Sequence, residues 1–92
     1  MDYRIVWSIQ ASKQMERLGR SVAKRIHEKV GQLHQNPERY VEKLVRYPYY
    51  RLRVGDYRVI LDIQNEMVRI LILKVGHRSN RSRSYSRPFT SR

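Results

Sequence analysis

The amino-terminal part of the chain begins with a strand-like pattern of apolar and polar positions. Residues 3–7 read YRIVW, with Tyr3, Ile5 and Trp7 at every second position. Side chains of a strand alternate between its two faces, so these three are expected to share one face. This short segment therefore predicts a first strand with one apolar side.

Apolar residues then recur at helical spacing in two segments separated by Gly19. Their members are Ala11, Met15 and Leu18 in the first segment, and Val22, Ile26, Val30 and Leu33 in the second. We expect Gly19 to end the first helix and Ser21 to cap the second. Asn36-Pro37 should stop the second helix, because proline disfavours a helical conformation in the residue before it. The pattern predicts a helical hairpin.

Beyond residue 42 the period of the pattern changes to two. We expect a short strand at Leu44-Val45 and longer strands at Tyr49–Val54, Tyr57–Ile63 and Met67–Val75. Gly55-Asp56 separates two of these strands and suits a two-residue hairpin turn, because glycine readily adopts a positive φ. The carboxyl-terminal half is thus predicted to form hairpins.

The order of these elements favours an α+β fold with a small antiparallel sheet of about four strands. The helical hairpin would pack on one face of that sheet. From Ser79 onward the chain is rich in serine and arginine and of low complexity. We expect one domain over residues 1–85 and a basic tail over residues 86–92.

The hairpin register implied by the Gly55-Asp56 turn gathers three arginines on one face. Arg53 would lie opposite Arg58, with Arg51 diagonal to Arg58, and the apolar alternate positions would face the helices. If the next turn centres on Asn65-Glu66, Asp62 would lie opposite Arg69 and this pair would neutralise itself. No acid in the local register is expected to do so for the three arginines. The cluster is interpreted as a phosphate-binding site, or alternatively as a solvated edge of the sheet.

Charge strengthens the first interpretation. The chain has 20 Lys and Arg against 8 Asp and Glu, for a formal net charge of +12. Arginine's planar fork suits phosphate, so nucleic acid or an acidic protein is the expected partner, although a solvated basic surface is the alternative. Tyr49 and Tyr85 are candidate stacking platforms for unpaired bases.

Other kinds of chemistry find little support. There is no cysteine, and His27 and His34 lack a third ligand at suitable spacing, so we expect no metal and no cofactor. No apolar run is long enough for a membrane span, and no signal peptide is apparent, which predicts a cytoplasmic protein. His77 stands beside Arg78 and is either a general acid or base or a surface histidine at a strand end.

The stretch "YYRLRVGDYRVILDI", followed by a short turn, "VRILILKVGHR" and a later tyrosine, resembles the RelE/ParE toxin family over roughly residues 3–85. The resemblance implies a toxin of a toxin–antitoxin pair, with a cognate antitoxin as partner. RelE-like members cut mRNA in the ribosomal A site, whereas ParE-like members poison DNA gyrase. A degenerate member that only binds RNA or antitoxin is a third possibility.

Carried over from the RelE branch, the resemblance implies a catalytic set with RNA-binding residues beside it. The catalytic set is Arg51, Arg53, Arg58, Arg78 and Tyr85, with His77 as a further candidate, and the RNA-binding residues are Tyr49, Arg81 and Arg83. Arg51 and Arg53 stand where the best-known members have lysines. Because arginine transfers protons poorly, the expected base is Tyr85 or His77. The spacing from Arg78 to Tyr85 is about one residue longer than in the family, so Arg81 is expected to share Arg78's role.

Overall fold

Five strands form one sheet in the order β1-β5-β4-β3-β2. The structure is a computed structural model that describes residues 2–78. The strands are β1 (Arg4–Trp7), β2 (Glu42–Lys43), β3 (Tyr50–Val54), β4 (Tyr57–Gln64) and β5 (Arg69–His77). The helices are α1 (Ile9–Glu16) and α2 (Arg20–Gly31), followed by the short 3-10 helices η1 (Gln32–His34) and η2 (Pro37–Arg39). The domain boundary expected at residue 85 lies outside the described residues.

The α+β class is confirmed, but the sheet is mixed instead of wholly antiparallel. β3, β4 and β5 follow one another as antiparallel neighbours, as the hairpin signals predict. β1 instead pairs in parallel with β5, Arg4 lying opposite Arg69 and Trp7 opposite Ile72. A tight turn sets the direction of a hairpin, whereas the partner of a strand more than 60 residues away in the sequence depends on tertiary packing. This is why local periodicity did not reveal the parallel pair.

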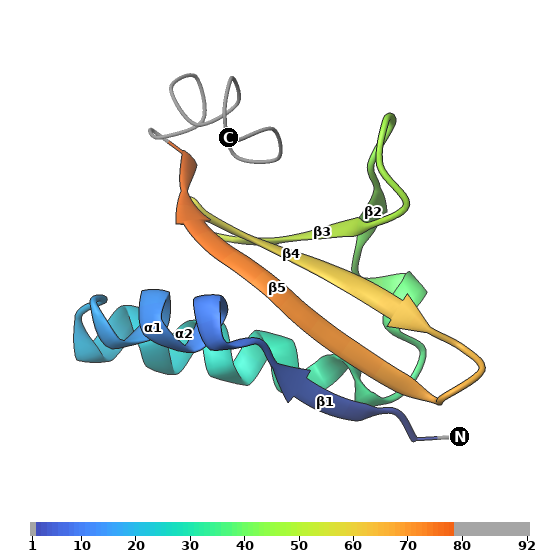
Figure 1. The fold of residues 1–92 in the computed structure, drawn as a ribbon. Helices are drawn as coiled ribbons and strands as arrows, with labels where there is room; N and C mark the ends of the chain where they lie inside the picture. The colour runs from blue at the N-terminus through green and yellow to red at the C-terminus, as the bar shows by residue number, and fades with distance from the viewer. Residues whose placement is uncertain (1, 79–92) are drawn as a thin grey trace.

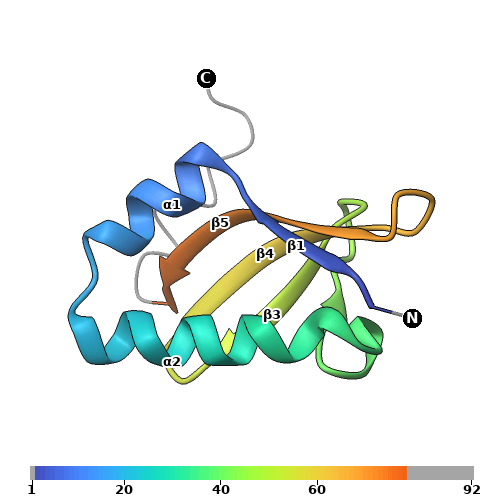
Figure 2. The same cartoon turned by 90° about the horizontal axis from the view of Figure 1, so that it is seen from below.

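The two helices cover one face of the sheet and leave the other to the β2–β3 connection (Figures 1 and 2). The helices contribute Ala11, Met15, Ile26 and Val30 to the core, and η1 contributes Leu33. From the sheet come Leu52, Val54, Val59, Leu61, Ile63, Ile70, Ile72 and Val75. The alternation expected for β3 and β4 is confirmed, because their helix-facing apolar residues are buried or packed against this core.

Helix ends differ in detail from the prediction. Ser8 caps α1, its Oγ accepting a hydrogen bond from the Ala11 N–H at 3.0 Å. α2 begins one residue after Gly19, so Gly19 and not Ser21 is its N-cap, and no side chain caps it. α2 ends at Gly31, before Asn36-Pro37, and Asn36 has a left-handed backbone with φ 50°. Asparagine tolerates this conformation better than most residues.

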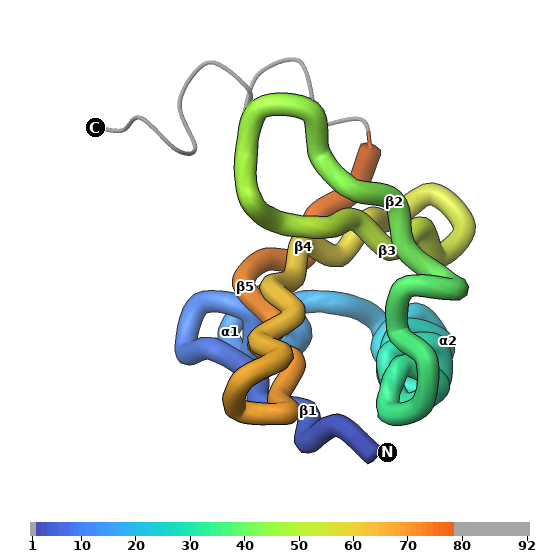
Figure 3. The backbone as a smooth tube through the Cα atoms, turned by 90° about the vertical axis from the view of Figure 1, so that its right-hand side faces the viewer, coloured from blue at the N-terminus to red at the C-terminus, as the bar shows by residue number. Residues whose placement is uncertain are grey.

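The short strand predicted at Leu44-Val45 lies two residues earlier, as β2, which pairs with β3. Residues 44–49 instead form a loop closed by a backbone hydrogen bond of 3.0 Å from the Leu44 N–H to the Tyr49 oxygen. This loop rises from the sheet on the side away from the helices, as the end-on view shows (Figure 3). Val45 is almost completely exposed there, so its apolar side chain was a misleading strand signal.

The connection between β4 and β5 also changes a predicted pairing. Arg69 lies opposite Gln64, and Asp62 lies opposite Leu71, because the turn occupies residues 65–68 and is longer than expected. Arg69 Nε donates a hydrogen bond of 2.6 Å to Gln64 Oε1. A bulge between Ile60 and Leu61 then shifts the rest of the ladder. The expected opposition of Asp62 and Arg69 is therefore wrong.

No helix among residues 2–78 has the length and apolar character required to cross a membrane.

Candidate functional site

The arginine cluster lies at one end of the sheet, on the face that the helices leave uncovered. Arg53 is opposite Arg58, and Arg51 is opposite Ile60, so the predicted register is confirmed. The turn between the strands has φ 59° at Gly55, the positive value that glycine adopts without strain. Alternation of side chains then directs all three arginines to the same face. Ile60, opposite Arg51, is buried on this face, so the face is partly covered there.

A carboxylate on the edge strand contacts two of these arginines. Glu42 in β2 lies opposite Arg51 in β3, and Arg51 Nη2 donates a hydrogen bond of 2.8 Å to Glu42 Oε1. Arg53 Nε is 3.7 Å from the same oxygen. The expectation that no local acid neutralises the cluster is thus wrong. Placing the strand two residues too late concealed Glu42, and the correct strand position is the signal that would have found it.

Arg51 has the largest electrostatic effect on the Glu42 carboxylate. Its hydrogen bond and positive charge, with a smaller contribution from Arg53, lower the pKa of Glu42 below the ordinary value of 4.5. The Arg51 side chain is only 19% exposed, whereas that of Glu42 is 57% exposed. Arg51 Nε is buried without a hydrogen-bond partner in the described part of the chain. Arg51 is therefore held in place, and the carboxylate is the accessible member of the pair.

Arg78 reaches the same end of the sheet from the last strand. Its N–H donates a hydrogen bond of 2.8 Å to the Asp56 carbonyl oxygen, in the turn between β3 and β4. The Arg78 side chain also forms an exposed ion pair with Asp56, Nε lying 3.9 Å from Oδ1. Arg78 is thus brought beside the turn that joins Arg53 to Arg58, although 20 residues separate it from Arg58.

Gly76 provides open space next to Arg58. The two residues are directly opposite each other, so a side chain at position 76 would share the face of Arg58. A Cβ atom added at Gly76 would meet no atom within 4 Å. Sequence reasoning did not single out this glycine, whose importance depends on the β4–β5 register and hence on the bulge.

His77 lies on the other face of the sheet. It is opposite Tyr57, and the two rings meet edge to face with centroids 4.8 Å apart. Tyr57 packs against the core, so this pair shares the helix-covered side, whereas Arg53 and Arg58 are on the opposite side. The sheet therefore separates the His77 ring from these two arginines, even though His77 directly precedes Arg78.

The remaining candidates are only partly described. Tyr49 is half-buried at the end of the loop that leads into β3. Arg81, Arg83 and Tyr85 lie outside the described residues, so their predicted roles are not addressed by the geometry. Within residues 2–78, no three His, Cys, Asp or Glu side chains come together as a metal-binding group.

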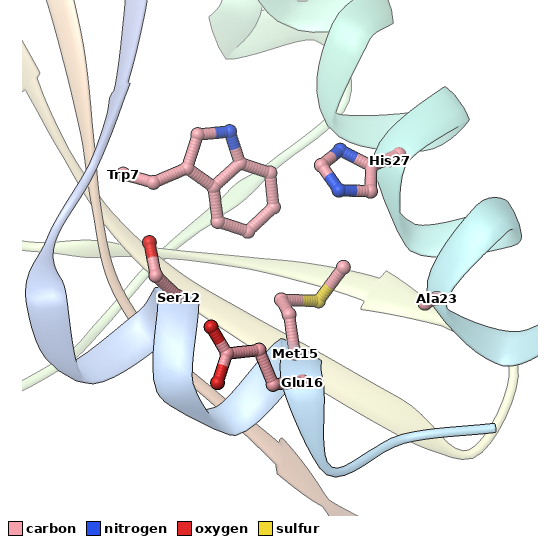
Figure 4. A pocket seen from close by; sticks show the side chains of 6 residues that line it. All are labelled: Trp7, Ser12, Met15, Glu16, Ala23 and His27. Carbon is pink, nitrogen blue, oxygen red and sulfur yellow. The ribbon is translucent and has the colours of Figure 1, made fainter. Parts of the chain in front are cut away.

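A separate pocket of about 370 Å³ opens on the helical side, between α1, α2 and the end of β1. Figure 4 shows the Trp7 and His27 rings next to each other in its lining, with Met15 and Glu16 on the α1 side. The Trp7 and His27 rings are 4.9 Å apart between centroids. None of the arginines described above lines this pocket, so it is distinct from the arginine site.

The sequence matches the family model described as the ParE toxin of the type II toxin–antitoxin system parDE, over residues 5–81. The chain belongs to the RelE/ParE toxin family. This membership confirms the resemblance seen in residues 49–78. No protein of curated function matches the sequence at a significant level.

Solved structures of RelE toxins share the fold of this family member. In the Pyrococcus horikoshii RelE–RelB complex, the matching chain is 33% identical with a TM-score of 0.72, covering 85% of this chain and 97% of that one. In the Mycobacterium tuberculosis RelBE2 complex, the values are 26% identity and a TM-score of 0.80, with coverage of 86% and 94%. An Escherichia coli RelE mutant in the free state is 25% identical with a TM-score of 0.72, with coverage of 94% and 93%.

Proposed function

We propose that this toxin is a ribosome-dependent endoribonuclease that cleaves mRNA in the A site. The observation that carries the proposal is that Arg51, Arg53 and Arg58 share one sheet face, while Arg78 lies beside the turn that joins their strands. Guanidinium groups stabilise the negative charge that gathers on phosphoryl oxygens during phosphoryl transfer. A protein that only binds another protein has no evident need for this arrangement.

The reaction proposed for this site uses the RNA itself as nucleophile. The 2′-hydroxyl loses its proton and attacks the adjacent phosphorus, and the bond from phosphorus to the 5′-oxygen breaks. The products are a 2′,3′-cyclic phosphate and a 5′-hydroxyl, whose oxygen has gained a proton. The arginines hold the phosphate and stabilise its charge, and the mechanism assigns no role to a metal or cofactor.

Proton transfer is assigned to Tyr85 in preference to His77. The His77 ring packs against Tyr57 on the helix-covered face, away from Arg53 and Arg58. Neighbouring arginines favour a phenolate, which makes a tyrosine near the cluster a suitable base. The RNA-binding residues of the proposal are Tyr49, Arg81 and Arg83. The proposed toxin domain spans residues 1–85, and residues 86–92 form a basic tail.

A cognate antitoxin is the proposed protein partner. Two of the similar structures are RelE toxins in complex with RelB antitoxins. The net charge of +12 favours a partner that carries acidic groups. Because its proposed target is the translating ribosome, the toxin is proposed to act in the cytoplasm.

Inhibition of DNA gyrase is the second candidate function, favoured by the match to the ParE family model. It predicts altered DNA supercoiling in arrested cells and intact transcripts. The nuclease proposal instead predicts cleaved transcripts and unaltered DNA supercoiling. The arginine cluster favours the nuclease, because gyrase inhibition does not require a phosphate-binding site.

The deciding experiment maps mRNA ends in cells that express the wild-type toxin, the Arg58→Ala variant or the Lys29→Ala variant. Lys29 is an exposed residue of α2, so its replacement removes one positive charge from the helical side of the sheet. We expect growth arrest and A-site cleavage with wild type and Lys29→Ala. Arg58→Ala should cleave at least about 100-fold less, as expected when a major electrostatic group is removed. Intact transcripts in arrested wild-type cells would contradict the proposal.

A further inference from the structure

The carboxylate of Glu42 supplies an anionic oxygen that contacts both Arg51 and Arg53. A single atom, Glu42 Oε1, lies 2.8 Å from Arg51 Nη2 and 3.7 Å from Arg53 Nε. Two guanidinium groups that converge on one anionic oxygen are arranged as they would be around a phosphoryl oxygen. We propose that Glu42 is an internal competitor for the phosphate-binding site, which an RNA phosphate must displace before it contacts Arg51 and Arg53.

Glu42 is placed where displacement is easy. It belongs to β2, an edge strand of only two residues that pairs on one side with β3. Its side chain is 57% exposed, and ion pairs this exposed to solvent contribute little to stability. Arg51 is by contrast largely buried, so the arginine stays in position when the carboxylate moves away. The site is thus kept assembled and occupied until a stronger anion arrives.

The electrostatics favour a competitor over a proton acceptor. Arg51 and Arg53 lower the pKa of Glu42, so its carboxylate is ionised at neutral pH and binds protons weakly. A general base works best when its pKa is near the operating pH. A fixed negative charge beside two arginines instead weakens the binding of every other anion at that point. Only a ligand with further phosphates, which also reach Arg58 and Arg78, gains enough additional contacts to bind well.

The inference rests on the proposed function, because it names RNA as the displacing anion. The consequence is selectivity for a strand with several phosphates over a single small anion. Asp56 stands beside Arg78 in a similar way, but its contact is longer, at 3.9 Å, and both side chains are more than two-thirds exposed. Glu42 is therefore the residue at which competition should be measurable.

The test compares wild type with Glu42→Gln and with Glu66→Gln as a matched control. Glu66 is exposed in the β4–β5 turn, so its replacement removes the same charge elsewhere. Fluorescence anisotropy measures binding of a 2′-O-methyl oligoribonucleotide, which cannot be cleaved, at fixed moderate salt. We expect Glu42→Gln to bind about fivefold tighter, as for the loss of one nearby repulsive charge, with less than about twofold change in Glu66→Gln. Thermal unfolding checks that both variants are folded.

Two results at this step would overturn the inference. Weaker binding by Glu42→Gln would mean that the carboxylate positions the arginines for RNA. Unchanged binding together with a loss of cleavage of about 100-fold or more would mean that Glu42 moves a proton.

Measuring A-site cleavage by the same variants separates this inference from the proposed function. Tighter binding by Glu42→Gln without cleavage by any variant supports internal competition and overturns the nuclease. Cleavage by wild type without tighter binding by Glu42→Gln overturns the competition and leaves the nuclease standing. Absence of RNA binding by every variant overturns the competition, and it overturns both proposals if no variant cleaves mRNA either.

Discussion

At the scale of single residues, the arginine cluster is stable because its charges are partly compensated within the chain. Arg53 and Arg58 are directly opposed, an arrangement that is destabilising for like charges. Glu42 offsets this at Arg51 and Arg53, and Asp56 does so at Arg78. Both acids are more than half exposed, so the compensation is reversible. The residues that hold the site together are thus the same residues that a phosphate would replace.

Acid should weaken the contribution of Glu42 to folding stability. Its pKa is lowered in the folded protein, so its stabilising effect is fully present above the ordinary value of 4.5 and disappears as the pH falls through the lowered value. We expect the difference in unfolding free energy between wild type and Glu42→Gln to be constant from pH 7 down to about 5 and to shrink below 4.5. Urea unfolding at a series of pH values measures this difference. A difference that grows on acidification would contradict the assigned ion pair.

Gly76 allows a direct test of the space beside Arg58. Gly76→Val should fold, because the position is open and valine favours strands. The added methyl groups would occupy the space next to Arg58, so we expect RNA cleavage to fall about tenfold or more, as for misplacement of a bound reacting group. The cleavage activity of Gly76→Ala, which adds one methyl group, should lie between those of wild type and Gly76→Val. Wild-type activity in a folded Gly76→Val variant would show that phosphate does not approach there.

At the scale of elements, ends and edges are controlled by side chains that are distant in sequence. Ser8 caps α1 and also donates a hydrogen bond of 3.1 Å to the Leu73 carbonyl oxygen in β5. Gln14 of α1 accepts a hydrogen bond of 2.6 Å from the Val75 N–H. Both contacts satisfy backbone groups of β5 beyond the end of β1. α1 therefore protects a sheet edge that would otherwise expose unpaired groups.

Two serines should respond differently to replacement by alanine. Ser8→Ala removes the α1 cap and the contact with β5, and we expect a loss of stability of about 1–2 kcal/mol. Ser21→Ala should be neutral or slightly stabilising, within about 0.5 kcal/mol, because Ser21 lies inside α2 at an exposed position and alanine is the better helix former. Chemical denaturation of both variants gives the comparison. Equal losses would place the cap of α2 at Ser21 after all.

At the scale of the whole molecule, the two faces of the sheet are used differently. One face is covered by α1 and α2 and holds the core together with the Trp7–His27 pocket. The other face carries Arg51, Arg53 and Arg58, and the loop of residues 44–49 rises from the sheet on that side (Figure 3). Arg51 and Arg53 of β3 and Arg58 of β4 share this face because the two strands are neighbours, and Arg78, directly after β5, lies beside their turn. RNA binding is therefore expected to depend on one face only.

The salt dependence of RNA binding tests whether RNA binds only to the face that carries the arginines. For single-stranded RNA, the logarithm of the binding constant falls against the logarithm of salt concentration by roughly 0.7 per phosphate contact. We expect Arg78→Ala to make the slope shallower by about that amount. Lys29→Ala, on the helical side, should leave the slope unchanged. A similar change in both variants would indicate binding by net charge over the whole surface.

The sequence by itself determined the fold class, the helical hairpin, the strands β3 to β5 and the face that carries Arg51, Arg53 and Arg58. These features follow from local rules, since periodicity defines faces and the Gly55 turn sets the register of its own hairpin. The family was also identifiable from the stretches of residues 49–63 and 68–78 and a later tyrosine, because each stretch is a continuous run of sequence.

Only the tertiary structure decided the parallel pairing of β1, the position of β2, and the surroundings of the arginines. Glu42, Asp56 and Gly76 acquire their roles from pairings between strands and from the bulge in the β4–β5 ladder. The separation of His77 from Arg53 and Arg58 likewise follows from its pairing with Tyr57 across that ladder. Such contacts depend on which strands become neighbours. That choice is made by packing of the whole core, and the local sequence pattern does not contain it.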